Sequence, residues 1–153
     1  ILGLGLNKYD EAIEYQEKAF DIYVKQLGYD HLGLAESHEA MALFSYSQCK
    51  FDKAFDCCNK SLEIKIKKLG NNHPILAETF FNLATIRSKK GDCNEALELY
   101  TNSLDILSKE LEDDHPHLVD CYDGMANVCY NHNEYSAALE YCNKSLKIKR
   151  KHP

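Results

Sequence analysis

The stretch Cys58–Leu62 (CNKSL) occurs again as Cys142–Leu146, and Ile64-Lys65 returns in the same register as Ile148-Lys149. These copies are two steps of a shorter period. The step is marked by four alanines, each 42 residues after the one before: Ala12, Ala54, Ala96 and Ala138. Self-similarity at a fixed spacing of this length indicates an array of repeats, and such arrays bind other proteins more often than they catalyse reactions.

Residues 74–111 show what one repeat contains. Pro74 suits the first turn of a helix, with Asn72 or His73 available as its cap. Apolar residues then recur at steps of three and four up to Gly91, which can close a helix in the left-handed conformation. Asp92 is placed to cap a second helix with its own apolar stripe. Each repeat is therefore predicted to be a first helix (helix A), a tight turn and a second helix (helix B).

The period extends this prediction to the whole chain. We expect one turn of helix A near 1–6 and helix B over 8–27, so that the chain opens inside a repeat. Three complete pairs follow, at 32–48 with 51–69, 74–90 with 92–111, and 116–131 with 134–151. Ala84 and Ala96 should allow these paired helices to approach closely, with Leu83 and Tyr100 filling the adjoining space. Met41 and Cys58 should take these roles one repeat earlier, and Met125 and Cys142 one repeat later.

Composition narrows the classes of function. The chain has 153 residues and a net charge of −6, which disfavours a nucleic-acid surface, because phosphate binding needs clustered Lys and Arg. No apolar run reaches the roughly 18 residues of a membrane span, and no signal peptide is recognisable. Seven cysteines, several in place of apolar residues of sister repeats, favour buried reduced thiols over a disulfide framework. We therefore expect a cytoplasmic protein.

The motif Leu83-Ala84, Gly91-x-Cys93-x-x-Ala96, Tyr100 and Ser103-Leu104 resembles the tetratricopeptide repeat. The 42-residue period and junctions such as Asn72-His73-Pro74 resemble the longer variety of kinesin light chains and nephrocystin-type proteins. Cys49 and Asn133 depart from the pattern by replacing the turn glycine. The resemblance implies an all-α, right-handed superhelical solenoid of antiparallel helix pairs. It would form one array over 1–153, with a partial repeat at 1–30 and repeats at about 31–72, 73–114 and 115–153.

The resemblance also implies which side chains face the concave groove formed by the A helices. Five of these positions carry carboxylates, and the deeper ones carry hydroxyl, amide and aromatic groups. Acidic residues also suit the first turn of any helix through its dipole, an explanation that fits Glu36, Glu78 and Asp120 better than Glu39 and Asp123. The full set of expected groove residues is Glu36, Glu39, Leu43, Tyr46, Glu78, Phe81, Asn82, Thr85, Ser88, Lys89, Asp120, Asp123, Asn127 and Tyr130.

We expect a scaffold or adaptor module whose groove binds an extended basic or polar peptide, without cofactor and without catalysis. The alternative is a structural spacer or a segment that self-associates through its incomplete N-terminal end, where Ile1, Leu2, Leu4, Ile13 and Phe20 would be uncovered. A metal site built from His31, His73 and His115 is disfavoured, because equivalent positions of stacked repeats lie about 10 Å apart. Cys121 and Cys129, near His132, are better explained as packed thiols than as a nucleophile with its base.

Overall fold

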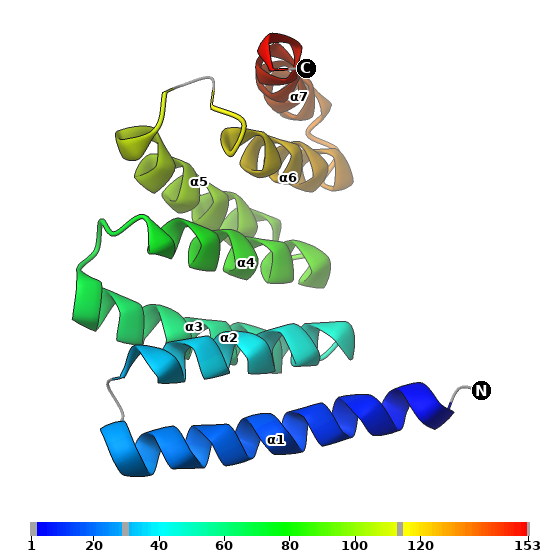
Figure 1. Ribbon diagram of the computed structural model, residues 1–153. Coiled ribbons are helices and arrows are strands. Elements are labelled where there is room, and N and C mark those ends of the chain that lie inside the picture. Colours follow the sequence, from blue (N-terminus) through cyan, green and yellow to red (C-terminus); the bar gives the residue numbers. More distant parts are fainter. Residues whose placement is uncertain (1–2, 29–30, 113–114, 153) are drawn as a thin grey trace. The chain divides into compact units, whose positions relative to one another are not determined.

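The computed structural model describes the backbone of residues 3–28, 31–112 and 115–152, and the side chains of these residues except 3–7, 9, 10 and 27. Every regular element in these ranges is a helix (Figure 1). The expected pairs of helices are present, and most bounds lie within two residues of the prediction. The seven helices of this part of the chain are α1 (Gly3–Leu27), α2 (Leu32–Ser47), α3 (Phe51–Leu69), α4 (Ile75–Lys90), α5 (Cys93–Glu110), α6 (Leu118–Asn131) and α7 (Tyr135–Lys151).

The chain divides into two compact units, Ile1–Gly70 and Asn71–Pro153. In the first unit α2 and α3 form an antiparallel hairpin, and α1 packs against α2. In the second unit α4 pairs with α5 and α6 pairs with α7, while α6 packs on α5 and also touches α4. Each hairpin is one repeat, so the fold within each unit is that of an all-helical repeat protein.

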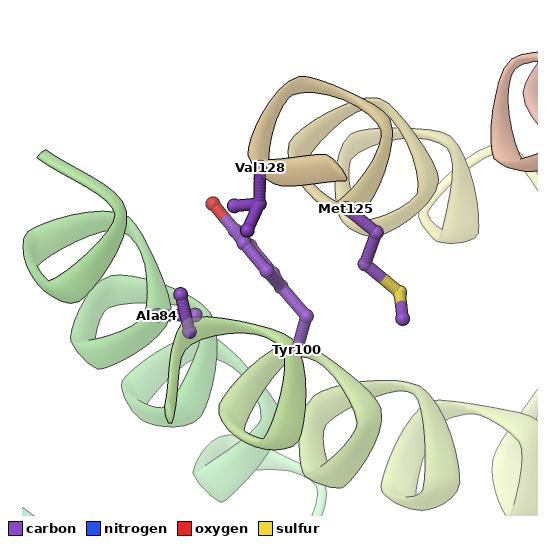
Figure 2. Packing of buried hydrophobic residues seen from close by; sticks show 5 residues of the cluster. Ala84, Tyr100, Met125 and Val128 are labelled. Carbon is purple, nitrogen blue, oxygen red and sulfur yellow. The ribbon is translucent and has the colours of Figure 1, made fainter. Parts of the chain in front are cut away.

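Small side chains allow the close approach of paired helices, as the period predicts. Ala84 of α4 and Ala96 of α5 are fully buried, and their counterparts in the other hairpins are buried as well. Leu83 and Tyr100 fill the space beside these alanines. Met125 and Val128 of α6 then pack on Ala84, Ala96 and Tyr100 and join the second repeat to the third (Figure 2).

The turns between paired helices share one backbone conformation. Gly91 adopts φ 94° after α4, while Cys49 and Asn133 adopt φ 58° and 64° at the equivalent positions. The following residue, for example Asp92, donates its backbone N–H to the carbonyl five residues earlier, as in a Schellman motif. The two departures from the family's turn glycine therefore keep the glycine-like geometry, and the carbonyls at the ends of the A helices are satisfied.

Three histidines begin the A helices in the same way. The Nδ1 atom of His31 accepts the backbone N–H of Gly33 at 3.0 Å, His73 accepts that of Ile75 at 3.3 Å, and His115 accepts that of His117 at 3.2 Å. Each imidazole thus satisfies a free donor at a helix N-terminus, as a capping residue does. This confirms the capping role offered by His73, and His31 and His115 repeat it.

The structure corrects three local expectations. Helix α1 runs without a break through Asn7, where a turn between the end of helix A and the start of helix B was expected. Asp92 makes no capping bond; its carboxylate instead accepts from Arg87 at 3.0 Å. Cys142, expected to fill space like Tyr100, is exposed on α7.

The expected apolar patch at the N-terminal end is only partly within the described residues. Ile1, Leu2 and the side chain of Leu4 lie outside them. Ile13 and Phe20 are both half-buried, and the ring of Phe20 makes an edge-to-face contact with His38 of α2 at 5.0 Å. Phe20 is therefore engaged in the packing of α1 on α2.

Candidate functional site

The second unit contains a hollow of about 370 Å³ where the first turns of α4 and α6 meet the end of α5. Four of the predicted groove residues line it: Glu78, Phe81, Asn82 and Asp120. The remaining lining residues are Pro74, Ile75, Ala77, Ser103, Leu107, His117 and Cys121. The hollow therefore combines apolar walls with two carboxylates and an amide, a mixture typical of sites for peptide side chains.

A buried chain of hydrogen bonds fixes the floor of the hollow. The hydroxyl of Ser103 donates to the carbonyl of Ala77 at 2.8 Å, and the thiol of Cys121 lies 3.5 Å from the same hydroxyl and donates to it. Burial raises the pKa of Cys121 despite the hydrogen bond to Ser103, so this thiol stays protonated. The floor ties α4, α5 and α6 together and is chemically inert.

Glu78 and Asp120 carry the negative charge of the hollow. Both are exposed and lie in the first turns of α4 and α6, where the helix dipole favours a carboxylate. Among the described residues neither carboxylate is in an ion pair. Their charge is therefore available to a ligand as well as to the helix end.

Glu39 and Asp123 are in a different electrostatic situation. Glu39 of α2 pairs with the buried Lys65 of α3, and Asp123 of α6 pairs with Lys149 of α7 at 2.7 Å. The two pairs occupy the same positions of their hairpins. Helix B thus partly neutralises the two carboxylates to which the sequence pattern gave the stronger binding role.

The remaining predicted residues are distributed over three helices. On α2, Glu36 and Leu43 are exposed and Tyr46 is half-buried, making an edge-to-face contact with Phe51 at 5.7 Å. On α4, Thr85 donates to the carbonyl of Phe81, and its hydroxyl lies 3.2 Å from that of Tyr100. Ser88 is half-buried near the end of α4, and Lys89 beside it is exposed.

Apart from Asp120, the predicted residues of α6 lie outside the first hollow. Asp123, Asn127 and Tyr130 line a second hollow of about 530 Å³ between α6 and α7. Tyr130 makes the same edge-to-face contact with Tyr135, at 5.7 Å, that Tyr46 makes with Phe51. The structure therefore brings together two subsets of the predicted groove residues in the second unit.

Sequence reasoning missed several residues of these sites. His117, Leu107 and Ile75 line the first hollow, and their signal was their place beside the repeat junctions, where neighbouring A helices begin. The lysines that neutralise Glu39 and Asp123 were also missed. Their signal was available, since the repeated Ile-Lys motif supplies a lysine at the same distance after each of these acids.

Four of the cysteines are poorly suited to nucleophilic chemistry. Cys57, Cys58, Cys121 and Cys129 are buried, and burial raises the pKa of each, that of Cys58 to about 12. A protonated thiol is a poor nucleophile. Within the described residues, no three His, Cys, Asp or Glu side chains are grouped so that they could hold a metal ion, and no helix is long and apolar enough to cross a membrane.

Comparison with models of protein families shows to which family the chain belongs. The profile of the tetratricopeptide repeat matches residues 35–109 and 82–151, and a second profile of the same repeat matches residues 4–33. The chain belongs to the tetratricopeptide repeat family. Repeats of this family are generally protein–protein interaction modules, and the family and its fold are typically non-enzymatic scaffolds. No curated protein matches the sequence.

Solved structures confirm the fold and its likeness to kinesin-light-chain repeats. The structure of BtubC (BKLC) from P. vanneervenii is similar with a TM-score of 0.86 and 18% identity, over 96% of this chain and 60% of that one. A putative kinesin light chain from Podosopora anserina with nearly identical TPR-like repeats follows at a TM-score of 0.81, 22% identity and coverages of 97% and 71%. MamA is similar at 0.69 and 16%, with coverages of 97% and 72%. The expected likeness to kinesin-light-chain repeats is therefore confirmed at the level of the fold.

Proposed function

We propose that the chain is an adaptor module that binds an extended peptide carrying Lys or Arg, and that the hollow beside Glu78 and Asp120 receives a basic side chain. The observation that supports this proposal is that two carboxylates from neighbouring A helices, neither in an ion pair within the described part of the chain, share one hollow with apolar walls. A Lys or Arg side chain has the matching chemistry, because its methylene stem can lie along Phe81 and Leu107 while its charge reaches the carboxylates.

Glu39 and Asp123 are each paired with a lysine. The proposed recognition of the ligand therefore depends mainly on the acids in the first turns of the A helices. A ligand that competed for these two acids would have to displace Lys65 and Lys149, whereas Glu78 and Asp120 are available without any such exchange. Glu36 holds the equivalent place on α2 of the first unit. Asn82 would bind the peptide backbone through its amide.

The test is selection of peptides from a random display library, at low and at physiological salt. We expect enrichment of Lys- or Arg-bearing peptides whose affinity falls as salt is added, since exposed charges are screened. The double variant Glu78→Gln with Asp120→Asn should weaken the selected peptides by at least about tenfold, while the helical circular dichroism is unchanged.

A matched control removes the same charge elsewhere. Glu98 and Asp105 are exposed on α5 outside the hollow, and the double variant Glu98→Gln with Asp105→Asn changes the net charge equally. It should keep the affinity within about twofold, because long-range charge alone contributes little at physiological salt. Equal weakening by both double variants would reject a specific site in the hollow.

A further inference from the structure

We propose that the first hollow also holds an apolar side chain of the ligand, so that the recognised peptide motif is an apolar residue and a Lys or Arg two positions apart. This inference rests on the function proposed above and adds a second determinant to the same site. The lining of the hollow comes from α4, α5, α6 and the residues directly before α4 and α6, so the hollow lies within the second unit and not on the face of α7. The apolar side chain would contact Ile75, Phe81 and Leu107.

These three walls are apolar only in the middle repeat, which contains α4 and α5. The counterparts 42 residues before and after are Gly33 and His117 for Ile75, Glu39 and Asp123 for Phe81, and Lys65 and Lys149 for Leu107. In the other two complete repeats the last two positions form the ion pair that joins helix A to helix B. In the middle repeat the same positions carry an aromatic ring and a branched aliphatic chain, which leave apolar surface open to the hollow.

The leucine at the lysine position also affects the charge of the hollow. As far as the chain is described, no Lys or Arg is among the lining residues, whereas each of the other two repeats places a lysine beside its acid. Glu78 and Asp120 therefore carry their charge next to an apolar wall without a competing lysine or arginine. A ligand that matches both features presents a cation and an apolar group side by side.

The walls are held in place by the protein itself. The ring of Phe81 makes an edge-to-face contact with Tyr100, with 5.6 Å between the ring centroids, and Tyr100 is only 3% exposed. The hydrogen bonds of Ser103 fix the floor beneath them. Ile75 is 42% exposed, so its side chain is accessible to a ligand. A surface formed in advance loses little conformational entropy on binding, which favours a specific apolar contact.

The size of the hollow favours an extended peptide over a helix. The hollow measures about 370 Å³, whereas a single helical turn, about 5.4 Å long and about 10 Å across, already takes up about 400 Å³. In an extended chain, alternate side chains point to the same side and lie about 7 Å apart. The apolar and basic side chains that enter one hollow are therefore two positions apart, and the residue between them points away.

The test uses the full chain and a random library of displayed nine-residue peptides. We expect Leu, Ile, Met or Phe to be enriched at least about threefold two positions from the selected Lys or Arg, and not directly beside it. The consensus peptide is then synthesised with either its apolar or its basic residue changed to Ser. The apolar change should weaken binding at least about tenfold at low and at physiological salt. The loss from the basic change should become smaller as salt is added.

Two variants of the protein remove the apolar walls. Phe81→Glu with Leu107→Lys installs the ion pair that the other two hairpins already accommodate, and it should weaken the consensus peptide at least about tenfold. On this variant the apolar-to-Ser peptide should bind within about twofold of the consensus peptide. Ile75→Ser alters one exposed side chain, so it tests the proposal even if the double variant does not fold, and it should weaken binding at least about fivefold.

A matched control removes an isoleucine elsewhere. Ile22 of α1 is 53% exposed and does not line the hollow. Ile22→Ser should keep the affinity for the consensus peptide within about twofold, because the change does not touch the site. Equal weakening by Ile22→Ser and Ile75→Ser would overturn the proposed apolar contact.

The selection separates this proposal from the function on which it rests. Enrichment of Lys or Arg without an apolar preference two positions away would overturn the proposal and leave the proposed function standing. Apolar enrichment that Phe81→Glu with Leu107→Lys abolishes, without any basic preference, would overturn the proposed function and with it the combined motif. No enrichment at all would reject both. Dimers in sedimentation that Ile75→Ser disperses would assign the apolar walls to a second copy of this chain.

Discussion

His38 shows how one residue of the repeat can carry a stability cost. Its ring is buried in α2 against Phe20, and its Nδ1 atom has no hydrogen-bond partner among the described residues. Burial, and then the charge of Lys60, lower the pKa of His38 below its usual value. The unfolded chain, with a pKa near 6.5, therefore binds this proton at higher pH than the folded chain does. Stability is present above about pH 6.5 and falls as the pH drops from there towards the folded pKa.

The substitution His38→Phe should remove this cost. Phe80 holds the equivalent position of α4, so another repeat of this chain accommodates phenylalanine there. We expect the free energy of unfolding at pH 7 to rise by about 1 kcal/mol, because an unsatisfied buried nitrogen is replaced by an apolar group. The loss of stability between about pH 7 and pH 5.5 should also become smaller. Urea unfolding of the variant and of an exposed control, His132→Asn, measures both effects, and an unchanged pH slope would contradict the assignment.

The two ion pairs across the hairpins should differ in energy. Lys65 is buried, with a side chain 5% exposed, whereas Lys149 is 50% exposed. The change Glu39→Gln removes a charge partner of a buried ammonium group and should cost about 2 kcal/mol of unfolding free energy. The change Asp123→Asn should cost less than about 1 kcal/mol, as exposed pairs do. Equal losses in denaturant unfolding would show that Lys65 finds full compensation from its other contacts.

At the scale of the helices, the joint between α5 and α6 depends on Gly124. Glycine inside a helix normally costs about 1 kcal/mol relative to alanine, so Gly124→Ala would stabilise an isolated helix. Here the added Cβ would lie 2.5 Å from Cζ and 2.7 Å from the hydroxyl oxygen of Tyr100, which is itself 3% exposed and cannot move freely. We therefore expect Gly124→Ala to lower the unfolding free energy by about 1–3 kcal/mol through overpacking.

A double-mutant cycle tests this joint. Tyr100→Cys introduces the smaller residue that stands at the equivalent positions 58 and 142, and it should be destabilising alone because a cavity remains. In the Tyr100→Cys background the cost of Gly124→Ala should largely vanish, which gives a coupling energy of at least about 1 kcal/mol. Additive losses would mean that the backbone of α6 absorbs the extra methyl group. Asn127→Ala, on the exposed side of α6, serves as the helix-propensity control.

The helices were predictable because each boundary has its own local chemistry. Three kinds of residue recur with the period: the capping histidines, the left-handed turn residues and the paired alanines. The helix bounds predicted in one repeat therefore supported those predicted in the others. A turn was predicted at Asn7 because this residue is in register with the turn residues Cys49, Gly91 and Asn133, but the backbone there is helical. The ion pairs of Glu39 and Asp123 were missed because a face assignment from helix A alone ignores the lysines of helix B.

At the scale of the whole molecule, the period predicts one array, and the helices form two compact units, Ile1–Gly70 and Asn71–Pro153. The 42-residue repetition describes the helix pair of each repeat and does not indicate where the boundary between two compact units falls. In an array of this kind, stability is approximately a sum of repeat terms and nearest-neighbour terms. The first hollow could be located only with the structure, because His117 and Leu107 belong to different helices of the second unit.

The division into units predicts that residues 71–153 fold and bind without the remainder. This fragment contains both helix pairs α4–α5 and α6–α7, the cluster around Tyr100, and every residue that lines the first hollow. We expect helical circular dichroism with a cooperative thermal transition, and an affinity for the selected Lys- or Arg-bearing peptides within about threefold of that of the full chain, since a threefold change is less than 1 kcal/mol. Fragment 1–70 serves as the comparison and should bind these peptides weakly, because it contains only two of the five groove acids, Glu36 and Glu39, and Glu39 is paired with Lys65. A folded 71–153 fragment that fails to bind would place essential contacts in the first unit, whereas an unfolded one would show that α4 needs the preceding repeat for its stability.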